Sequence, residues 1–160
     1  MAITKRRSSS QRGLTLNEIR HMQYLSKAID ETLRRSGIVL ATSRKAKVDV
    51  KINDYIIPKG WKVIIWNRGI HLDSEGFPNP EDFLPSRWDN HTPKAGSFIP
   101  FGAGSRICPG ADLAKLEMSI FFHYFLLNYR FERSNPGNPI RYLTCPSPKD
   151  NCLGKIIKLP

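Results

Sequence analysis

The sequence is poor in cysteine, and the spacing of the few it has argues against two classes of protein. Three cysteines stand among 160 residues, with no CxxC pair and no His/Cys cluster at zinc-site spacing. An odd, sparse set of this kind does not build a disulfide framework and fits a reducing compartment. Neither a secreted disulfide scaffold nor a structural zinc domain is therefore expected.

Long apolar runs are missing as well. The longest, Met118–Leu127, is interrupted by His123 and is too short to span a bilayer. The opening residues MAITKRRSSSQRG lack the apolar core of a secretory signal. Hydrophobic residues nevertheless make up 40% of the chain and the mean hydropathy is −0.38. These values exclude both a disordered chain and a membrane bundle, so we expect a globular chain without a membrane segment.

Acidic residues are scarce beside basic ones. The formal net charge is +11, from 25 Lys+Arg against 14 Asp+Glu, and residues 1–47 alone carry 11 basic and 3 acidic side chains. Such a balance suggests nucleic acid, an anionic membrane surface or an acidic protein as partner. The basic opening run has no interleaved aromatic residue to stack on bases. We therefore expect residues 1–13 to be a flexible basic segment and nucleic acid not to be the partner.

Local patterns predict two main helices. Thr15 and Glu18 form a capping box, and helical periodicity follows it to Gly37. Gly110 opens a second helix that runs to about Tyr129 and is apolar on nearly all sides. A helix of that kind is typical of the interior of a larger domain.

Short strands and one long irregular segment separate these helices. Residues 48–52 alternate and 55–57 return after an Asn-Asp turn, whereas residues 58–60 form a second turn before WKVIIW at 61–66. Residues 72–100 are rich in Pro, Asp, Asn and Gly, which disfavours both helix and central strand. Short strands with Pro turns are expected over 141–160. The pattern predicts a mainly α chain with small β-sheets.

The stretch Phe101–Gly110, FGAGSRICPG, carries most of the chemical information. Its glycines allow a backbone to approach a flat ligand closely. Cys108 lies just ahead of the second helix, where free N–H groups and the helix dipole stabilise a thiolate. Arg106 adds a cation that could pair with a carboxylate.

Three interpretations of this loop compete. A phosphate-binding loop lacks its Lys-Ser/Thr ending here. A nucleophilic cysteine requires a histidine base, and the spacing of His71, His91 and His123 selects none of them. An axial thiolate on haem iron needs one cysteine in a tight loop and cations for the propionates. The third interpretation uses every residue of the motif.

The loop resembles the haem-binding signature F-x-x-G-x-R-x-C-x-G of the cytochrome P-450 family. The matching positions are Phe101, Gly104, Arg106, Cys108 and Gly110. Two further motifs of the family have counterparts in the expected order. Glu31 and Arg34 resemble the E-x-x-R helix motif, and Pro85-Ser86-Arg87-Trp88 resembles the P-x-R-[FW] element.

The resemblance implies roles for these residues. Cys108 is expected to be the axial ligand of haem b, and Arg106 and Arg44 are expected to bind the haem propionates. Arg87 is expected to join Glu31 and Arg34 in a buried triad that braces the irregular segment. His71 stands at another familiar position, but it could equally be a packed core histidine. Residues 14–160 would then be the C-terminal part of the cytochrome P-450 fold.

The sequence from about residue 14 to 158 is similar to plant members of this family that oxidise terpenoids, the ent-kaurenoic acid and beta-amyrin oxidases. The resemblance implies a haem-thiolate monooxygenase that uses O2 and electrons from NADPH, delivered by an NADPH-cytochrome reductase, to oxidise a small hydrophobic terpenoid. It also implies an endoplasmic reticulum membrane location for the full-length parent, whereas this chain, lacking an anchor, is expected to be cytosolic.

An alternative function stays open. The 160 residues contain no oxygen-activation motif of the [AG]-G-x-[DE]-T kind, and family members are several times longer. We therefore expect a truncated product that carries the proximal half of the site and no catalytic residue of its own. The rival hypothesis is a catalytically inactive product or a haem- or protein-binding module.

Overall fold

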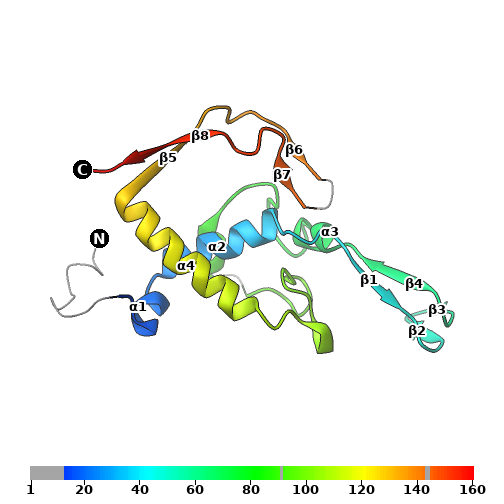
Figure 1. The fold of residues 1–160 in the computed structure, drawn as a ribbon. Helices are drawn as coiled ribbons and strands as arrows, with labels where there is room; N and C mark the ends of the chain where they lie inside the picture. Colours follow the sequence, from blue (N-terminus) through cyan, green and yellow to red (C-terminus); the bar gives the residue numbers. More distant parts are fainter. Residues whose placement is uncertain (1–12, 91, 143–144) are drawn as a thin grey trace.

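The computed structural model describes residues 13–90, 92–142 and 145–160 (Figure 1). Its helices are α1 (Leu16–Arg20), α2 (Gln23–Arg35), α3 (Asn67–His71) and α4 (Ala111–Asn128), with short 3-10 helices η2 (Pro85–Asp89) and η3 (Gly104–Arg106). Its strands are β1 (Thr42–Lys45), β2 (Val50–Ile52), β3 (Tyr55–Ile57), β4 (Lys62–Ile65), β5 (Tyr129–Arg133), β6 (Ile140–Arg141), β7 (Ser147–Pro148) and β8 (Gly154–Lys158). The predicted class, mainly α with small β-sheets, is confirmed. The predicted flexible segment lies outside the described residues, except for Gly13.

The predicted first helix begins as expected but is not continuous. Thr15 caps α1, with its hydroxyl accepting from the Glu18 N–H at 3.2 Å and its own N–H donating to Glu18 Oε2 at 2.7 Å. The prediction of one helix to Gly37 is wrong at His21 and Met22. There the His21 ring contacts the Asn17 carbonyl oxygen at 2.7 Å, and the Met22 backbone has a non-helical ψ of 56°. The chain therefore turns between α1 and α2.

The strands between α2 and α3 form a β arm, residues 42–65, that extends away from the helices (Figure 1). The predicted hairpin is present as β2–β3, and Asn53 at its turn has a φ of 51°. The second predicted turn also forms, with the Trp61 N–H donating to the Pro58 carbonyl at 3.1 Å. It does not return β4 onto β3, however. Instead β4 pairs antiparallel with β1, a strand that the sequence pattern did not predict.

The long segment after α3 is irregular, as its composition predicts. The one regular element among its described residues is η2, which begins with Pro85, whose missing N–H costs nothing at a helix start. The residues immediately before this segment form α3, a single helical turn that the sequence pattern did not predict.

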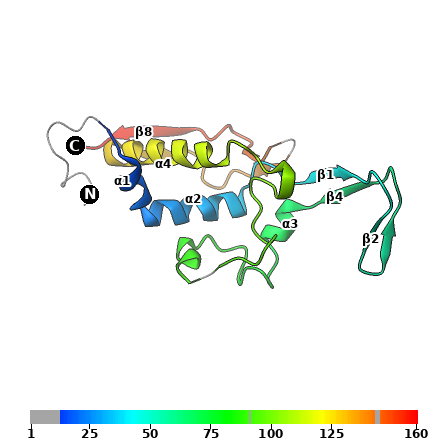
Figure 2. The ribbon, with the colours of Figure 1, turned by 90° about the horizontal axis from the view of Figure 1, so that it is seen from below.

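Helix α2 is central to the arrangement. In Figure 2 it lies between α4 and the irregular segment, and it contacts both α4 and η2. Lys115 of α4 forms an ion pair with Asp30 of α2 at 2.7 Å. The ribbon β5–β8 lies on the other side of α4 from α2 (Figure 2). Strand β5 starts at Tyr129, where the helical pattern ends.

The buried interior of the described chain is small and largely polar. Only Ile29 and Phe77 are buried among the apolar residues, at 5% and 0% exposure. The buried polar side chains are Glu31, Arg34, Asn67 and His71. Helix α4 buries none of its 18 residues. No helix among the described residues combines the length and apolar character needed to cross a membrane.

Candidate functional site

Two motifs that are far apart in the sequence meet at the Glu31 carboxylate. One turn of α2 separates Glu31 from Arg34, so both side chains point to the same face. Arg34 donates from Nε to Oε2 at 3.0 Å and from Nη2 to Oε1 at 2.8 Å. Arg87 Nε lies 3.4 Å from Oε1, the Leu84 N–H donates at 3.0 Å, and the Trp88 indole donates at 3.1 Å. The carboxylate is thus saturated with donors.

The remaining donors of the two arginines bind backbone carbonyls of the irregular segment and of α3. Arg34 donates to His71 O at 2.8 Å and to Asp82 O at 3.1 Å. Arg87 donates to Asn79 O at 3.1 Å and also to Pro78 O. We call Glu31, Arg34 and Arg87 the charge cluster. Its contacts fix the irregular segment onto α2.

Glu31 is held in its charged form by this cluster. Burial by itself would raise the pKa of the Glu31 carboxyl. The hydrogen bonds from Arg34 and Leu84 and the positive charges of Arg34 and Arg87 outweigh it, so the pKa of Glu31 lies below its ordinary value. An ionised carboxylate that accepts this many donors is a rigid anchor.

The cysteine loop is built on two glycines with positive φ. Gly102 has a φ of 81° and Gly104 of 70°, in the left-handed region where a Cβ is disfavoured. The loop closes through two backbone hydrogen bonds: the Cys108 N–H donates to Phe101 O at 2.9 Å and the Ile107 N–H to Gly104 O at 3.1 Å. Cys108 is exposed and lies directly ahead of α4.

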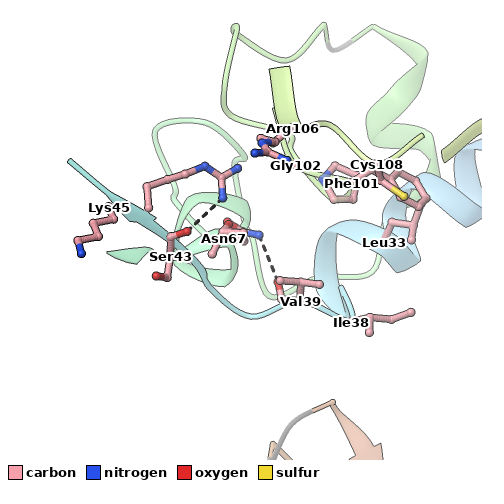
Figure 3. A pocket seen from close by; sticks show the side chains of 13 residues that line it. Leu33, Ile38, Val39, Ser43, Lys45, Asn67, Phe101, Gly102, Arg106 and Cys108 are labelled. Carbon is pink, nitrogen blue, oxygen red and sulfur yellow. Dashed lines mark hydrogen bonds between the residues drawn. The ribbon is translucent and has the colours of Figure 1, made fainter. Parts of the chain in front are cut away.

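A cavity of about 670 Å³ lies in front of this loop. It is bounded by the end of α2, by β1 and by the cysteine loop; its lining residues are Leu33, Ile38, Val39, Thr42, Ser43, Arg44, Lys45, Asn67, Pro100, Phe101, Gly102, Arg106 and Cys108. In Figure 3, Cys108, Phe101 and Leu33 lie at one end of it, and Ser43 and Lys45 at the other. We call it the cysteine cavity.

The cavity brings together four of the residues singled out from the sequence. Cys108, Arg106, Phe101 and Arg44 all line it, although Arg44 is 57 or more positions from the others and reaches the cavity through β1. The glycines of the signature, Gly104 and Gly110, shape the loop without lining the cavity.

Sequence reasoning missed several lining residues. Asn67, 2% exposed, accepts from the Thr42 hydroxyl at 3.0 Å and donates to Val39 O at 3.4 Å. These bonds fasten β1 to α3 and so position the wall that carries Arg44. The sequence feature that could have indicated this wall is the short polar stretch of residues 42–45. By itself it does not have a strand pattern, and it forms a strand by pairing with β4.

His71 is buried outside the cysteine cavity, with 2% of its surface exposed. Its Nε2 accepts the Ile99 N–H at 2.9 Å. Burial, together with the charge of Arg34, lowers the pKa of His71 to about 4. The ring is therefore neutral at physiological pH, with its single proton on Nδ1.

Within the described ranges, no histidine lines the cysteine cavity. His21 and His123 line a separate cavity of about 640 Å³ between α4 and the start of α2. His91 lies outside the described residues. The part of the chain that the structure describes also holds no cluster of three or more metal-ligating side chains. A cysteine nucleophile activated by a histidine base thus finds no support in this cavity.

Comparison with known proteins points to one family. A sequence model of the family described as Cytochrome P450 matches residues 3–150. Among curated proteins, a Beta-amyrin 11-oxidase of Glycyrrhiza uralensis is 63% identical over 157 residues, covering 98% of this chain and 32% of the relative. A 7,8-epoxymelianol synthase of Citrus sinensis is 59% identical over 157 residues, with the same coverage. Ent-kaurenoic acid oxidase 2 of Arabidopsis thaliana is 58% identical over 156 residues, also covering 98% and 32%.

A solved structure agrees with these sequence matches. The cyanobacterial CYP120A1 bound to retinoic acid superposes with a TM-score of 0.85 at 29% identity, covering 98% of this chain and 37% of that one. The chain spans about a third of the length of the curated relatives it matches, at 32% of each.

Proposed function

The chain belongs to the cytochrome P450 family, and from that premise we propose that its cysteine cavity binds haem b with Cys108 as the axial ligand of the iron. We further propose that this site serves an NADPH- and O2-dependent monooxygenase that oxidises a terpenoid. The single observation that carries the proposal is one cavity lined by Cys108 and by two arginines, Arg44 and Arg106.

The chemistry of the lining supports the fit of this cofactor. A volume of about 670 Å³ falls within the range of about 300–1,000 Å³ that is usual for small-molecule sites. A single cysteine can supply the thiolate ligand, two arginines can pair with two propionates, and aliphatic and aromatic side chains can cover the porphyrin faces. Each part of haem therefore finds a matching group in this set.

The roles of the chain's residues follow from their places in the loop. Cys108 would present its sulfur at the start of α4, where the free N–H groups of the helix stabilise the thiolate. The backbone at Gly104, with its positive φ, and at Gly110 would let the loop lie close to the macrocycle. Phe101 would pack beside the sulfur and exclude water from it.

When bound, haem would supply O2 activation and insertion of one oxygen atom into a C–H bond, and the electrons would come from NADPH through a reductase. This chain's own contribution would be to hold the ligand sulfur, to neutralise the propionates and to keep the irregular segment fixed through the charge cluster. A proton-relay residue for that chemistry is not identified in these 160 residues, because they lack the oxygen-activation motif.

The substrate class is proposed from the relatives, two of which are named as oxidases of beta-amyrin and ent-kaurenoic acid and one as a synthase of 7,8-epoxymelianol. A terpenoid substrate is therefore the proposal for this chain. A reductase with an acidic docking surface would suit the net charge of +11. An endoplasmic reticulum location for the full-length parent belongs to the same proposal.

Haem reconstitution tests the site. The 160-residue chain is mixed with haem, reduced and exposed to CO, and we expect the Soret position that marks a thiolate ligand. Cys108→Ala is expected to lose that signature. Cys145→Ser, which alters an exposed cysteine outside the cavity, is the matched control and is expected to keep it.

Two results would overturn the proposal: no haem uptake by the wild-type chain, or an unchanged spectrum in Cys108→Ala. Turnover of a triterpene with reductase and NADPH is a separate measurement. We expect none from these 160 residues alone.

A further inference from the structure

Two hydrogen bonds from different parts of the molecule meet at His71. Its backbone carbonyl accepts from Arg34 Nη1 at 2.8 Å, and its ring Nε2 accepts from the Ile99 N–H at 2.9 Å. The first bond ties the end of α3 to the charge cluster. The second ties the same residue to Ile99, in the irregular segment that leads into the cysteine loop. His71 is therefore the link between two features that are otherwise separate in the sequence.

From Ile99 the connection continues to the cysteine through the backbone. The Gly102 N–H donates to Ile99 O at 3.0 Å, and the Cys108 N–H donates to Phe101 O at 2.9 Å. Each of these bonds closes a turn of the loop. Together they hold the loop in a conformation that requires positive φ at Gly102 and Gly104. A shift at Ile99 would thus be passed to the residues that set the position of the Cys108 sulfur.

The surroundings of His71 leave the ring little freedom. It is 2% exposed, and its centroid lies 5.6 Å from that of Phe98, which in turn packs against Trp88 at 4.7 Å. Because Trp88 also donates to Glu31, these aromatic contacts connect the His71 ring to the charge cluster. A buried acceptor with one defined donor is worth more than an exposed one, since its loss leaves that donor unpaired.

We infer that His71 is a positioning residue for the cysteine loop: its neutral imidazole holds the Ile99 N–H and so sets the geometry in which Cys108 can ligate iron. This inference rests on the proposed function for its link to iron, but its structural part concerns the loop alone. Nothing in it requires His71 to touch haem or substrate.

Paired variants separate hydrogen bonding from packing. The amide oxygen of His71→Gln can take the place of Nε2 and accept from Ile99, whereas His71→Leu fills the space without an acceptor. In haem-reconstituted chains we expect His71→Leu to lose most of the thiolate-type CO spectrum and His71→Gln to keep it. His21→Leu, at the exposed histidine that follows α1, is the matched control and is expected to behave as wild type. A full thiolate signature in His71→Leu, or an equal loss in His71→Gln, would overturn the inference.

Hydrogen exchange on the haem-free chain makes the test independent of the proposed function. We expect exchange of the Ile99 amide to speed up about tenfold or more in His71→Leu and to stay near wild type in His71→Gln. If the wild type takes up no haem but shows this pattern, the proposed function fails and the positioning role stands.

If His71→Leu does not fold, nitrogen NMR of the wild-type ring decides. A neutral ring protonated on Nδ1 supports the inference, and one protonated on Nε2 contradicts it.

Discussion

The two long helices place their side chains in opposite ways. On α2, Glu31 and Arg34 are 0% and 1% exposed, and each is bound by partners from distant segments. On α4, which is apolar on nearly all sides, no residue is buried, and Phe121 and Leu126 are each 59% exposed. The more polar helix is thus the better buried of the two.

The difference shows what each kind of interaction needs. A buried ion pair is satisfied by a small number of well-placed donors, and this chain supplies them from α2, the irregular segment and α3. Burial of an apolar helix instead needs area on several sides, because the hydrophobic effect scales with surface removed from water. A helix apolar all round is typical of the interior of a larger domain. The chain spans about a third of the length of its relatives, at 32% of each.

Removing one partner of the charge cluster is expected to have the largest effect. Arg34→Ala leaves the Glu31 carboxylate buried without its main counter-ion, which typically costs about 3–5 kcal/mol of unfolding free energy. Arg35→Ala is the matched control, since Arg35 pairs with exposed Glu81 at 3.4 Å and such pairs contribute about 0–1 kcal/mol. Urea unfolding followed by circular dichroism measures both. Equal losses in the two variants would show that the cluster is no more important than a surface pair.

The next effect is a pH dependence that belongs to His71. In the unfolded chain its pKa returns to the ordinary value of 6.5, whereas in the fold it is lowered to about 4 by burial and by Arg34. Arg35 and Arg68 line the small cavity beside the ring and add positive charge there. Above pH 6.5 the residue is neutral in both states and contributes no pH dependence.

As the pH falls from 6.5 to about 4, only the unfolded state takes up the proton, so the fold is progressively destabilised. The loss of unfolding free energy approaches about 3 kcal/mol below pH 4, because the pKa of His71 is 6.5 in the unfolded chain and about 4 in the fold. His71→Gln removes this titration, so its unfolding free energy is expected to fall less than that of the wild type across the same window. Parallel curves for the two proteins would contradict a buried neutral His71.

The elements that the sequence predicted correctly depend on local signals. The capping box at Thr15, the hairpin β2–β3 and helix α4 are each encoded within one continuous stretch of the sequence. The strands that were missed depend on distant partners. The sequence of β1, TSRK, is polar and has no strand pattern of its own; it forms a strand by pairing with β4. Likewise β5 forms a strand by pairing with β8. Local propensity carries no information about such pairing.

The same distinction between local signals and distant contacts applies to the candidate site. Motif spacing singled out Cys108 and Arg106, and the family resemblance added Arg44; all three line one cavity. It could not predict that Asn67 fastens the wall carrying Arg44, or that His71 binds the Ile99 N–H 28 positions away. Those contacts arise from the packing of α3 against both β1 and the irregular segment, which no single segment encodes. The roles of the site residues toward haem stay predictions.

The smallest effect on stability is expected on α4, and it tests the other half of the comparison. Phe121→Gln with Leu126→Gln replaces two side chains that are each 59% exposed by good helix formers. The loss of the Phe121–Phe125 ring contact, with centroids 5.5 Å apart, is worth a few tenths of a kcal/mol on a helix surface. We therefore expect the unfolding free energy to change by less than about 1 kcal/mol. Binding of an apolar dye and self-association should both decrease, because a contiguous exposed apolar surface drives them. A loss of 2 kcal/mol or more would mean that α4 is packed in this chain as tightly as α2, and the contrast between the two helices would disappear.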